Sequence, residues 1–70
     1  MQQPKQETSP RLIRLPEVLA RTGLSRSQAY SLAGQSRFPR PIKLSERCAA
    51  WVESEVEAWI RERMAQREAA

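Results

Sequence analysis

The stretch Pro16-Glu-Val-Leu-Ala-Arg-Thr-Gly-Leu-Ser-Arg-Ser-Gln-Ala-Tyr-Ser-Leu-Ala-Gly-Gln-Ser36 predicts two short helices joined by a tight turn. Pro16 suits the start of a helix, because its missing N–H would have no partner there. Gly23 suits the end of that helix, since glycine adopts the left-handed conformation without a Cβ penalty. Ser25 is a good N-cap for a second helix, and Gln28 stands at the spacing of a capping box. Two helices joined in this way are typical of a helix-turn-helix.

The second predicted helix has an apolar side and a small polar side. At about 100° per residue, Ala29, Leu32 and Ala33 share the side expected to pack inward. The opposite side carries no acid, and Arg26 flanks it near the N-terminus. In a helix-turn-helix the second helix enters the major groove of DNA, so this side is predicted to face a duplex. The alternative is an αα-hairpin whose polar side faces only solvent. The outward residues are Ser27, Tyr30, Ser31 and Gln35.

Length and composition narrow the function classes. Seventy residues allow one small domain with a marginal core. No apolar run of about 18 residues and no signal segment is present, so we expect a cytoplasmic protein with no membrane partner. Cys48 is the only cysteine and there is no histidine. This leaves no disulfide, no soft-ligand zinc cluster and no Cys–His or Ser–His–Asp nucleophile. We therefore expect no enzyme, no cofactor, no metal and no small-molecule ligand.

The net charge of +4 is unevenly distributed along the chain. Residues 11–47 carry eight basic and two acidic side chains, whereas residues 48–70 carry five glutamates and three arginines. The basic part coincides with the predicted helix-turn-helix. A protein with one face on a polyanion is expected to show this layout, so double-stranded DNA is the predicted partner.

A short β-hairpin is predicted after the second helix. Residues 42–44 and 49–52 alternate in character and flank a loop of three to five residues. Two strands alone are unstable in water, so the hairpin must pack against the helices, with Ile42, Leu44 and Trp51 inward. Lys43 and Arg47 then lie outward as a basic wing beside the second helix. The loop has no glycine, which argues against a tight turn with positive φ.

The last element is predicted to be an amphipathic helix over residues 53–66, with residues 65–70 frayed. Its apolar stripe comprises Val52, Val56, Trp59, Ile60 and Met64. Ser54 and Glu57 have the spacing of a capping box. Trp51 and Trp59 are more typical of a core than of a base-stacking surface.

The beginning of the chain has two parts. Residues 1–10 are polar and predicted to be a disordered tail. Residues 11–15 read as an extended segment in which Leu12 or Ile13 covers the core edge. Arg11 and Arg14 there either touch phosphate or face solvent.

The ordered set of motifs strongly resembles the AlpA family of prophage regulatory proteins. The motifs are Arg11-Leu-Ile-Arg-Leu15, Thr22-Gly-Leu-Ser-Arg-Ser27, Phe38-Pro39 and Trp51-Val-Glu-Ser-Glu-Val-Glu-Ala-Trp-Ile60, and the resemblance covers about residues 11–67. It implies a winged helix-turn-helix domain over residues 11–67, mainly α with a small β-hairpin, comprising three helices and a two-stranded wing. It also implies a transcriptional regulator of a prophage or other mobile element.

Family membership implies site-specific binding to double-stranded DNA through the second helix and the wing. By position, the contacts fall on Ser25, Arg26, Ser27, Tyr30 and Ser31 of the helix and on Lys43 and Arg47 of the wing. Arg40 is expected to add sequence-independent attraction to phosphate. This chain departs from the family at Ser31, where members often have a basic residue, and in the wing turn, where they often have glycine.

Several roles stay open at the level of the sequence. Arg26 either reads guanine bidentately or contacts phosphate alone. The protein is alternatively an excisionase that bends attachment-site DNA, or a small protein-interaction module such as an antirepressor. A homodimer or a cooperative oligomer on DNA is expected from the small size of one module, with the last helix as a candidate contact.

Overall fold

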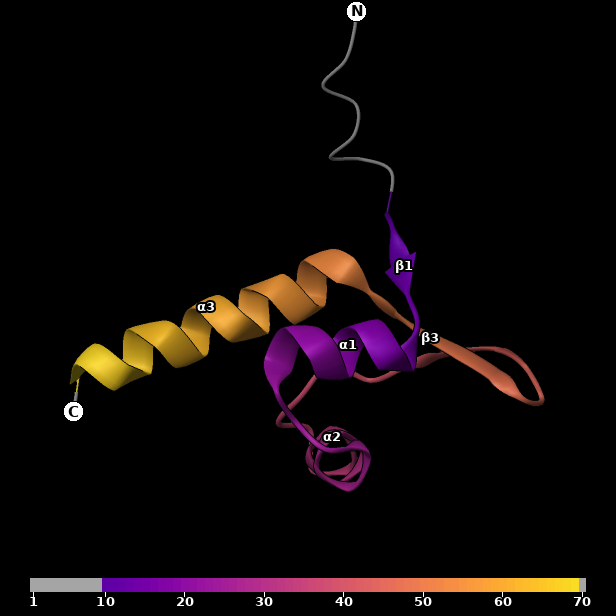
Figure 1. The fold of residues 1–70 in the computed structure, drawn as a ribbon, viewed down its shortest axis with the longest axis horizontal. Coiled ribbons are helices and arrows are strands. Elements are labelled where there is room, and N and C mark those ends of the chain that lie inside the picture. The colour runs from indigo at the N-terminus through magenta and orange to yellow at the C-terminus, as the bar shows by residue number, and fades with distance from the viewer. Residues whose placement is uncertain (1–9, 70) are drawn as a thin grey trace, which may run out of the picture.

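The structure is a computed structural model that describes residues 10–69, and these residues form three helices and three strands (Figure 1). The predicted tail lies outside the described residues except for Pro10. The fold is winged-helix-like, as the sequence predicts. The elements in chain order are β1 (Leu12–Ile13), α1 (Leu15–Thr22), α2 (Arg26–Gly34), β2 (Ile42–Ser45), β3 (Cys48–Val52) and α3 (Glu53–Ala69).

The helix-turn-helix forms through the capping residues that the sequence singles out. Gly23 has φ 77°, and its N–H donates to the Leu19 carbonyl at 2.8 Å, which ends α1. The Ser25 hydroxyl accepts from the Gln28 N–H at 3.1 Å, while the Gln28 side-chain oxygen accepts from the Ser25 N–H at 2.9 Å. The predicted capping box at the start of α2 is therefore confirmed.

A pair of glycine substitutions tests this turn. Gly23→Ala is expected to lower the free energy of unfolding by about 1–2 kcal/mol, because alanine at positive φ brings its Cβ close to the following carbonyl. Gly34→Ala, at the end of α2, is expected to raise it by about 0.5 kcal/mol, since alanine loses less backbone entropy on folding. Neither added Cβ meets an atom within 4 Å, so backbone conformation alone decides whether each substitution raises or lowers the free energy of unfolding. Urea denaturation measures both, and a loss of stability for Gly34→Ala would contradict this account.

The sheet has three antiparallel strands in the order β1-β3-β2. The extended segment before α1 is a true strand, with Leu12 opposite Val52 and Ile13 opposite Trp51. The hairpin turn contains two residues, Glu46 and Arg47, rather than the predicted three to five. Pairing shifts between Lys43 and Ser45, so Leu44 is the extra residue of a β-bulge. The bulge increases the local twist, which allows a short turn without positive φ.

The prediction that Ile42 and Leu44 point inward with Trp51 is wrong. Ile42 pairs with Ala50, the neighbour of Trp51 on β3, and successive residues of a strand point to opposite faces. Ile42 therefore lies on the face opposite Trp51 and is 41% exposed, and Leu44 is 50% exposed.

The core forms where α1, α2 and α3 meet β3. Its buried cluster comprises Ile13, Val18, Ala33, Phe38, Trp51 and Val56. Both tryptophans belong to the packed interior, as predicted: Trp51 is fully buried, and Trp59 packs against the cluster. The Trp51 Nε1 donates to the Pro39 carbonyl at 3.0 Å, and the Trp59 Nε1 donates to the Arg37 carbonyl at 2.8 Å. The two indoles thus hold the α2–β2 connector on both sides of Phe38.

The last helix begins where the sequence predicts but differs from the prediction in its capping and at its C-terminal end. It begins at Glu53, directly after β3, so Ser54 lies inside the first turn and is not the N-cap. It continues to Ala69 instead of fraying from residue 65. Met64 belongs to the predicted apolar stripe but is 51% exposed, because this half of the helix extends beyond the core (Figure 1).

Candidate nucleic-acid interface

The start of α1, the N-terminal half of α2 and the β2–β3 hairpin border one open groove of about 650 Å³. Four of the eight predicted contact residues line it, two from each side: Arg26 and Tyr30 from α2, and Lys43 and Arg47 from the hairpin. The structure thus brings the basic hairpin beside the second helix, as the sequence predicts. Figure 1 shows the hairpin extending away from the helices on one side of the molecule.

Tyr30 connects this groove to the core. Its ring meets the buried Trp51 edge-on, with centroids 5.8 Å apart, while 40% of the residue stays exposed. The Arg26 guanidinium carbon lies 5.8 Å from the centroid of the Tyr30 ring, within the range of a cation–π contact. Because Tyr30 is held by Trp51, it gives Arg26 a fixed surface at the N-terminal end of α2.

The three predicted serines of α2 are exposed but do not line this groove. Ser27 and Ser31 lie together along a separate shallow depression on α2. The Ser31 hydroxyl accepts from the Gln35 side-chain nitrogen at 3.1 Å. The Ser25 hydroxyl accepts the capping bond from Gln28, which leaves its proton for an external acceptor.

Arg40 also lies apart from the groove, in the connector between α2 and β2. Its guanidinium donates to the Ser36 hydroxyl at 3.3 Å. Ser36 is in the left-handed conformation with φ 62°, and its N–H donates to the Ala33 carbonyl at 3.1 Å. Arg40 is thereby exposed near the C-terminal end of α2.

Arg14 is a groove residue that sequence reasoning left undecided. It lines the groove from the start of α1, and its Nε donates to the Ala49 carbonyl of β3 at 3.1 Å. Arg11, which shares the same alternating pattern, lies 4.0 Å from the Glu53 carboxylate. The alternating pattern alone does not predict which of the two arginines lines the groove, because this depends on where β1 ends and α1 begins.

Positive charge in the groove contrasts with ion pairs elsewhere. Among residues 10–69, Arg14, Arg26, Lys43 and Arg47 have no carboxylate within 4.0 Å. Arg21 instead contacts three carboxylates, those of Glu17 at 2.6 Å, Glu53 at 2.8 Å and Glu57 at 3.1 Å. Glu46, at the hairpin turn, is the one acid among the groove residues.

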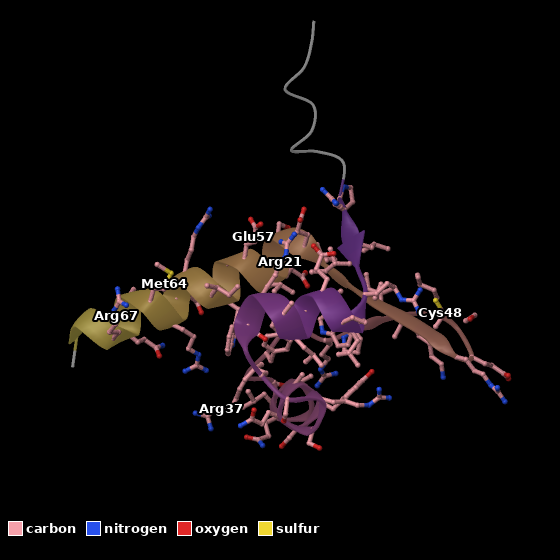
Figure 2. The ribbon with its side chains drawn as sticks, viewed as in Figure 1. Arg21, Arg37, Cys48, Glu57, Met64 and Arg67 are labelled. Atoms are coloured by element: carbon pink, nitrogen blue, oxygen red, sulfur yellow. The ribbon has the colours of Figure 1, made fainter. Side chains whose placement is uncertain are left out.

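The acidic cluster around Arg21 lies on the side of α1 that faces α3. Figure 2 shows Arg21 and Glu57 together there, whereas α2 lies on the other side of α1. The hydrogen bond to Glu17, followed by that to Glu53, raises the pKa of Arg21 above its ordinary value. Three glutamates are therefore paired away from the groove, and none of them neutralises its cations.

Two further features bear on the type of site. Within the described part of the chain, no group of three or more His, Cys, Asp or Glu side chains is arranged to hold a metal ion. Over the same residues, no helix has the length and apolar character needed to cross a membrane.

Comparisons with known proteins agree with the resemblance in the sequence. A family model described as prophage CP4-57 regulatory protein (AlpA) matches residues 11–64. The uncharacterized protein ORF88 of Enterobacteria phage P4 is 43% identical over 60 residues, covering 86% of this chain and 68% of that protein. The DNA-binding transcriptional activator AlpA of Escherichia coli strain K12 is 29% identical over 59 residues, covering 76% of this chain and 84% of that protein.

Proposed function

The chain belongs to the AlpA family of prophage regulatory proteins, and from this premise we propose that it regulates transcription by binding a specific site on double-stranded DNA. In the proposed complex α2 lies in the major groove, and the β2–β3 hairpin lies on the adjacent backbone or minor groove. The bacterial relative is described as a DNA-binding transcriptional activator, which supports this choice over an excisionase or an antirepressor.

The observation that carries the proposal is the groove itself. Arg14, Arg26, Lys43 and Arg47 converge on it from three elements without carboxylate partners among residues 10–69. A protein that needed these cations for its own stability would pair them, as it pairs Arg21. Unpaired cations that surround an exposed helix are the arrangement expected for a polyanion.

The proposed roles divide between reading bases and holding phosphates. Arg26, near the N-terminus of α2, bonds a guanine through its two guanidinium nitrogens, and Ser27 and Ser31 contact base edges or phosphates along α2. The Ser25 and Tyr30 hydroxyls donate to phosphate. Sequence-independent attraction comes from Arg14, Arg40, Lys43 and Arg47.

Binding titrations at several salt concentrations test the proposal. If about five to six phosphates are neutralised, the logarithm of the association constant falls against the logarithm of salt with a slope of about −5. A duplex recovered by selection from a random pool provides the specific site, and a scrambled duplex provides the control. An antirepressor would show no salt-sensitive binding to either duplex, and that result would overturn the proposal.

The location of the site in the host genome separates regulation from excision. Chromatin capture followed by sequencing is expected to place the protein at a promoter of the mobile element. Enrichment confined to the attachment site, with no change in neighbouring transcripts on deletion, would indicate an excisionase instead.

A further inference from the structure

Glu46 is the one acid among the residues that line the groove, and it stands at the hairpin turn. The turn comprises only Glu46 and Arg47, between the ends of β2 and β3. Figure 1 shows this turn at the end of the hairpin farthest from the helices. Because the turn is so short, Glu46 keeps its place at the tip of the hairpin. A partner that fills the groove therefore meets a carboxylate there as well as cations.

The Glu46 carboxylate has no basic partner in the described part of the chain. No cation of residues 10–69 lies within 4.0 Å of it, although Lys43 and Arg47 are close in sequence. The residue is exposed. The glutamates that contact Arg21, by contrast, are paired. Both carboxylate oxygens of Glu46 are thus available as acceptors to a donor outside the protein.

A carboxylate against a duplex is unfavourable unless the DNA supplies a donor. Phosphates repel the carboxylate, and its removal from water costs free energy that only a hydrogen bond offsets. The donors that base edges present are amino groups: those of cytosine and adenine in the major groove, and the N2 amino group of guanine in the minor groove. Glu46 is therefore suited to one of these amino groups, and the groove that the hairpin enters decides which.

The minor groove is the one that the tip of the hairpin reaches in the proposed complex. With α2 in the major groove, the hairpin beside it extends over the flanking backbone toward the minor groove. A·T pairs show only acceptors in the minor groove, and A-tracts have an enhanced negative potential there. Both features repel a carboxylate. The N2 amino group of guanine is the donor that remains for Glu46.

We propose that Glu46 makes the hairpin a reader of one G·C pair, by accepting a hydrogen bond from the N2 amino group of guanine in the minor groove. The proposal deepens the DNA binding proposed above and rests on it. Arg26 and Glu46 then read opposite edges of the duplex, the first in the major groove and the second in the minor groove. Arg47 without Glu46 would instead favour a narrow A·T-rich groove, because its negative potential attracts arginine.

Replacing each guanine of the selected duplex in turn by inosine tests the assignment. Inosine lacks the N2 amino group but keeps the major-groove acceptors, so the contact proposed for Arg26 is undisturbed. At one G·C pair outside the α2 contacts, inosine is expected to weaken wild-type binding by about tenfold or more, the usual contribution of a hydrogen bond to a charged group. An A·T pair at that position is expected to have the same effect. Diaminopurine in place of its adenine restores the amino group and is expected to restore the affinity.

Three variants assign the effect to Glu46. Glu46→Ala is expected to lose the preference for guanine over inosine, and to bind the scrambled duplex more tightly than the wild type because a negative charge is removed. Glu46→Gln keeps an acceptor oxygen and is expected to retain part of the preference. Glu62→Ala is the matched control, since Glu62 is exposed on α3 outside the groove and its loss changes the net charge equally. Any effect of inosine on the duplex itself is common to all these proteins.

Each outcome has a distinct meaning. Failure of the wild type to prefer the selected duplex over the scrambled one overturns the proposed function, and the role of Glu46 falls with it. Specific binding that is insensitive to inosine and independent of Glu46 overturns the role of Glu46 alone. Inosine sensitivity that persists in Glu46→Ala does the same, since another group then reads the amino group. A G·C preference that requires Glu46 but survives inosine places the carboxylate on cytosine in the major groove, which overturns the minor-groove contact.

Discussion

Trp51→Ala is expected to unfold most of the protein at room temperature. Trp51 is fully buried between the helices and the sheet, and large-to-small changes at such sites cost about 3–5 kcal/mol. The variant also loses the hydrogen bond to the Pro39 carbonyl and the edge contact with Tyr30. Domains commonly have about 5–15 kcal/mol of stability in total, and one of this size lies near the lower end. Urea denaturation monitored by circular dichroism measures the loss in the free energy of unfolding.

Trp51→Phe separates the contribution of the buried ring volume from that of the hydrogen bond to the Pro39 carbonyl. The phenyl ring fills much of the indole volume but leaves the Pro39 carbonyl without its donor, which costs about 1–3 kcal/mol. We therefore expect the free energy of unfolding to fall from the wild type to Trp51→Phe and again to Trp51→Ala. A Trp51→Ala protein no less stable than Gly23→Ala would show that Trp51 does not organise the core.

Arg26→Ala is expected to relax sequence discrimination, whereas Lys43→Ala is expected to weaken binding to every duplex alike. A bidentate arginine–guanine contact contributes about 1–3 kcal/mol of discrimination, so Arg26→Ala narrows the gap between selected and scrambled duplexes by that amount. Lys43 is proposed to neutralise a phosphate, so its loss is expected to reduce the magnitude of the salt slope by about 0.9 without changing the gap in affinity between the two duplexes. Titration of both variants on both duplexes measures the two effects separately.

The control for these variants is Arg61→Ala. Arg61 is an exposed arginine on α3, outside the groove, and its removal changes net charge by the same amount. It is expected to leave discrimination unchanged and the salt slope close to that of the wild type. Equal losses for Arg26→Ala and Lys43→Ala on both duplexes would contradict the roles assigned to them.

Local signals in the sequence predict the helices well because each has a local physical cause. Gly23 and Ser25 end and begin helices through their own backbone preferences and hydrogen bonds. Trp51 and Trp59 are large and apolar enough that burial follows from their type. The basic groove follows from the placement of Arg26 and Lys43 on neighbouring elements, which the order of the motifs indicates.

Pairing register and strand partners are less accessible to sequence reasoning. The face of Ile42 depends on its pairing with Ala50, and an offset of one residue would turn it inward. The strand formed by Leu12 and Ile13 exists only because β3 provides a partner far along the chain. Arg14 enters the groove for the same non-local reason, since its anchor is the carbonyl of Ala49.

The two indole hydrogen bonds to the connector around Phe38 have a consequence for the DNA sequences that the protein is expected to prefer. Because the indoles of Trp51 and Trp59 donate hydrogen bonds to the carbonyls on both sides of that ring, the spacing between α2 and the hairpin is set within the protein itself. In the proposed complex with DNA, a spacing that is already set means that the protein loses little conformational entropy on binding. A duplex whose groove width does not match must deform, and flexible base steps at positions that no side chain touches are thereby favoured.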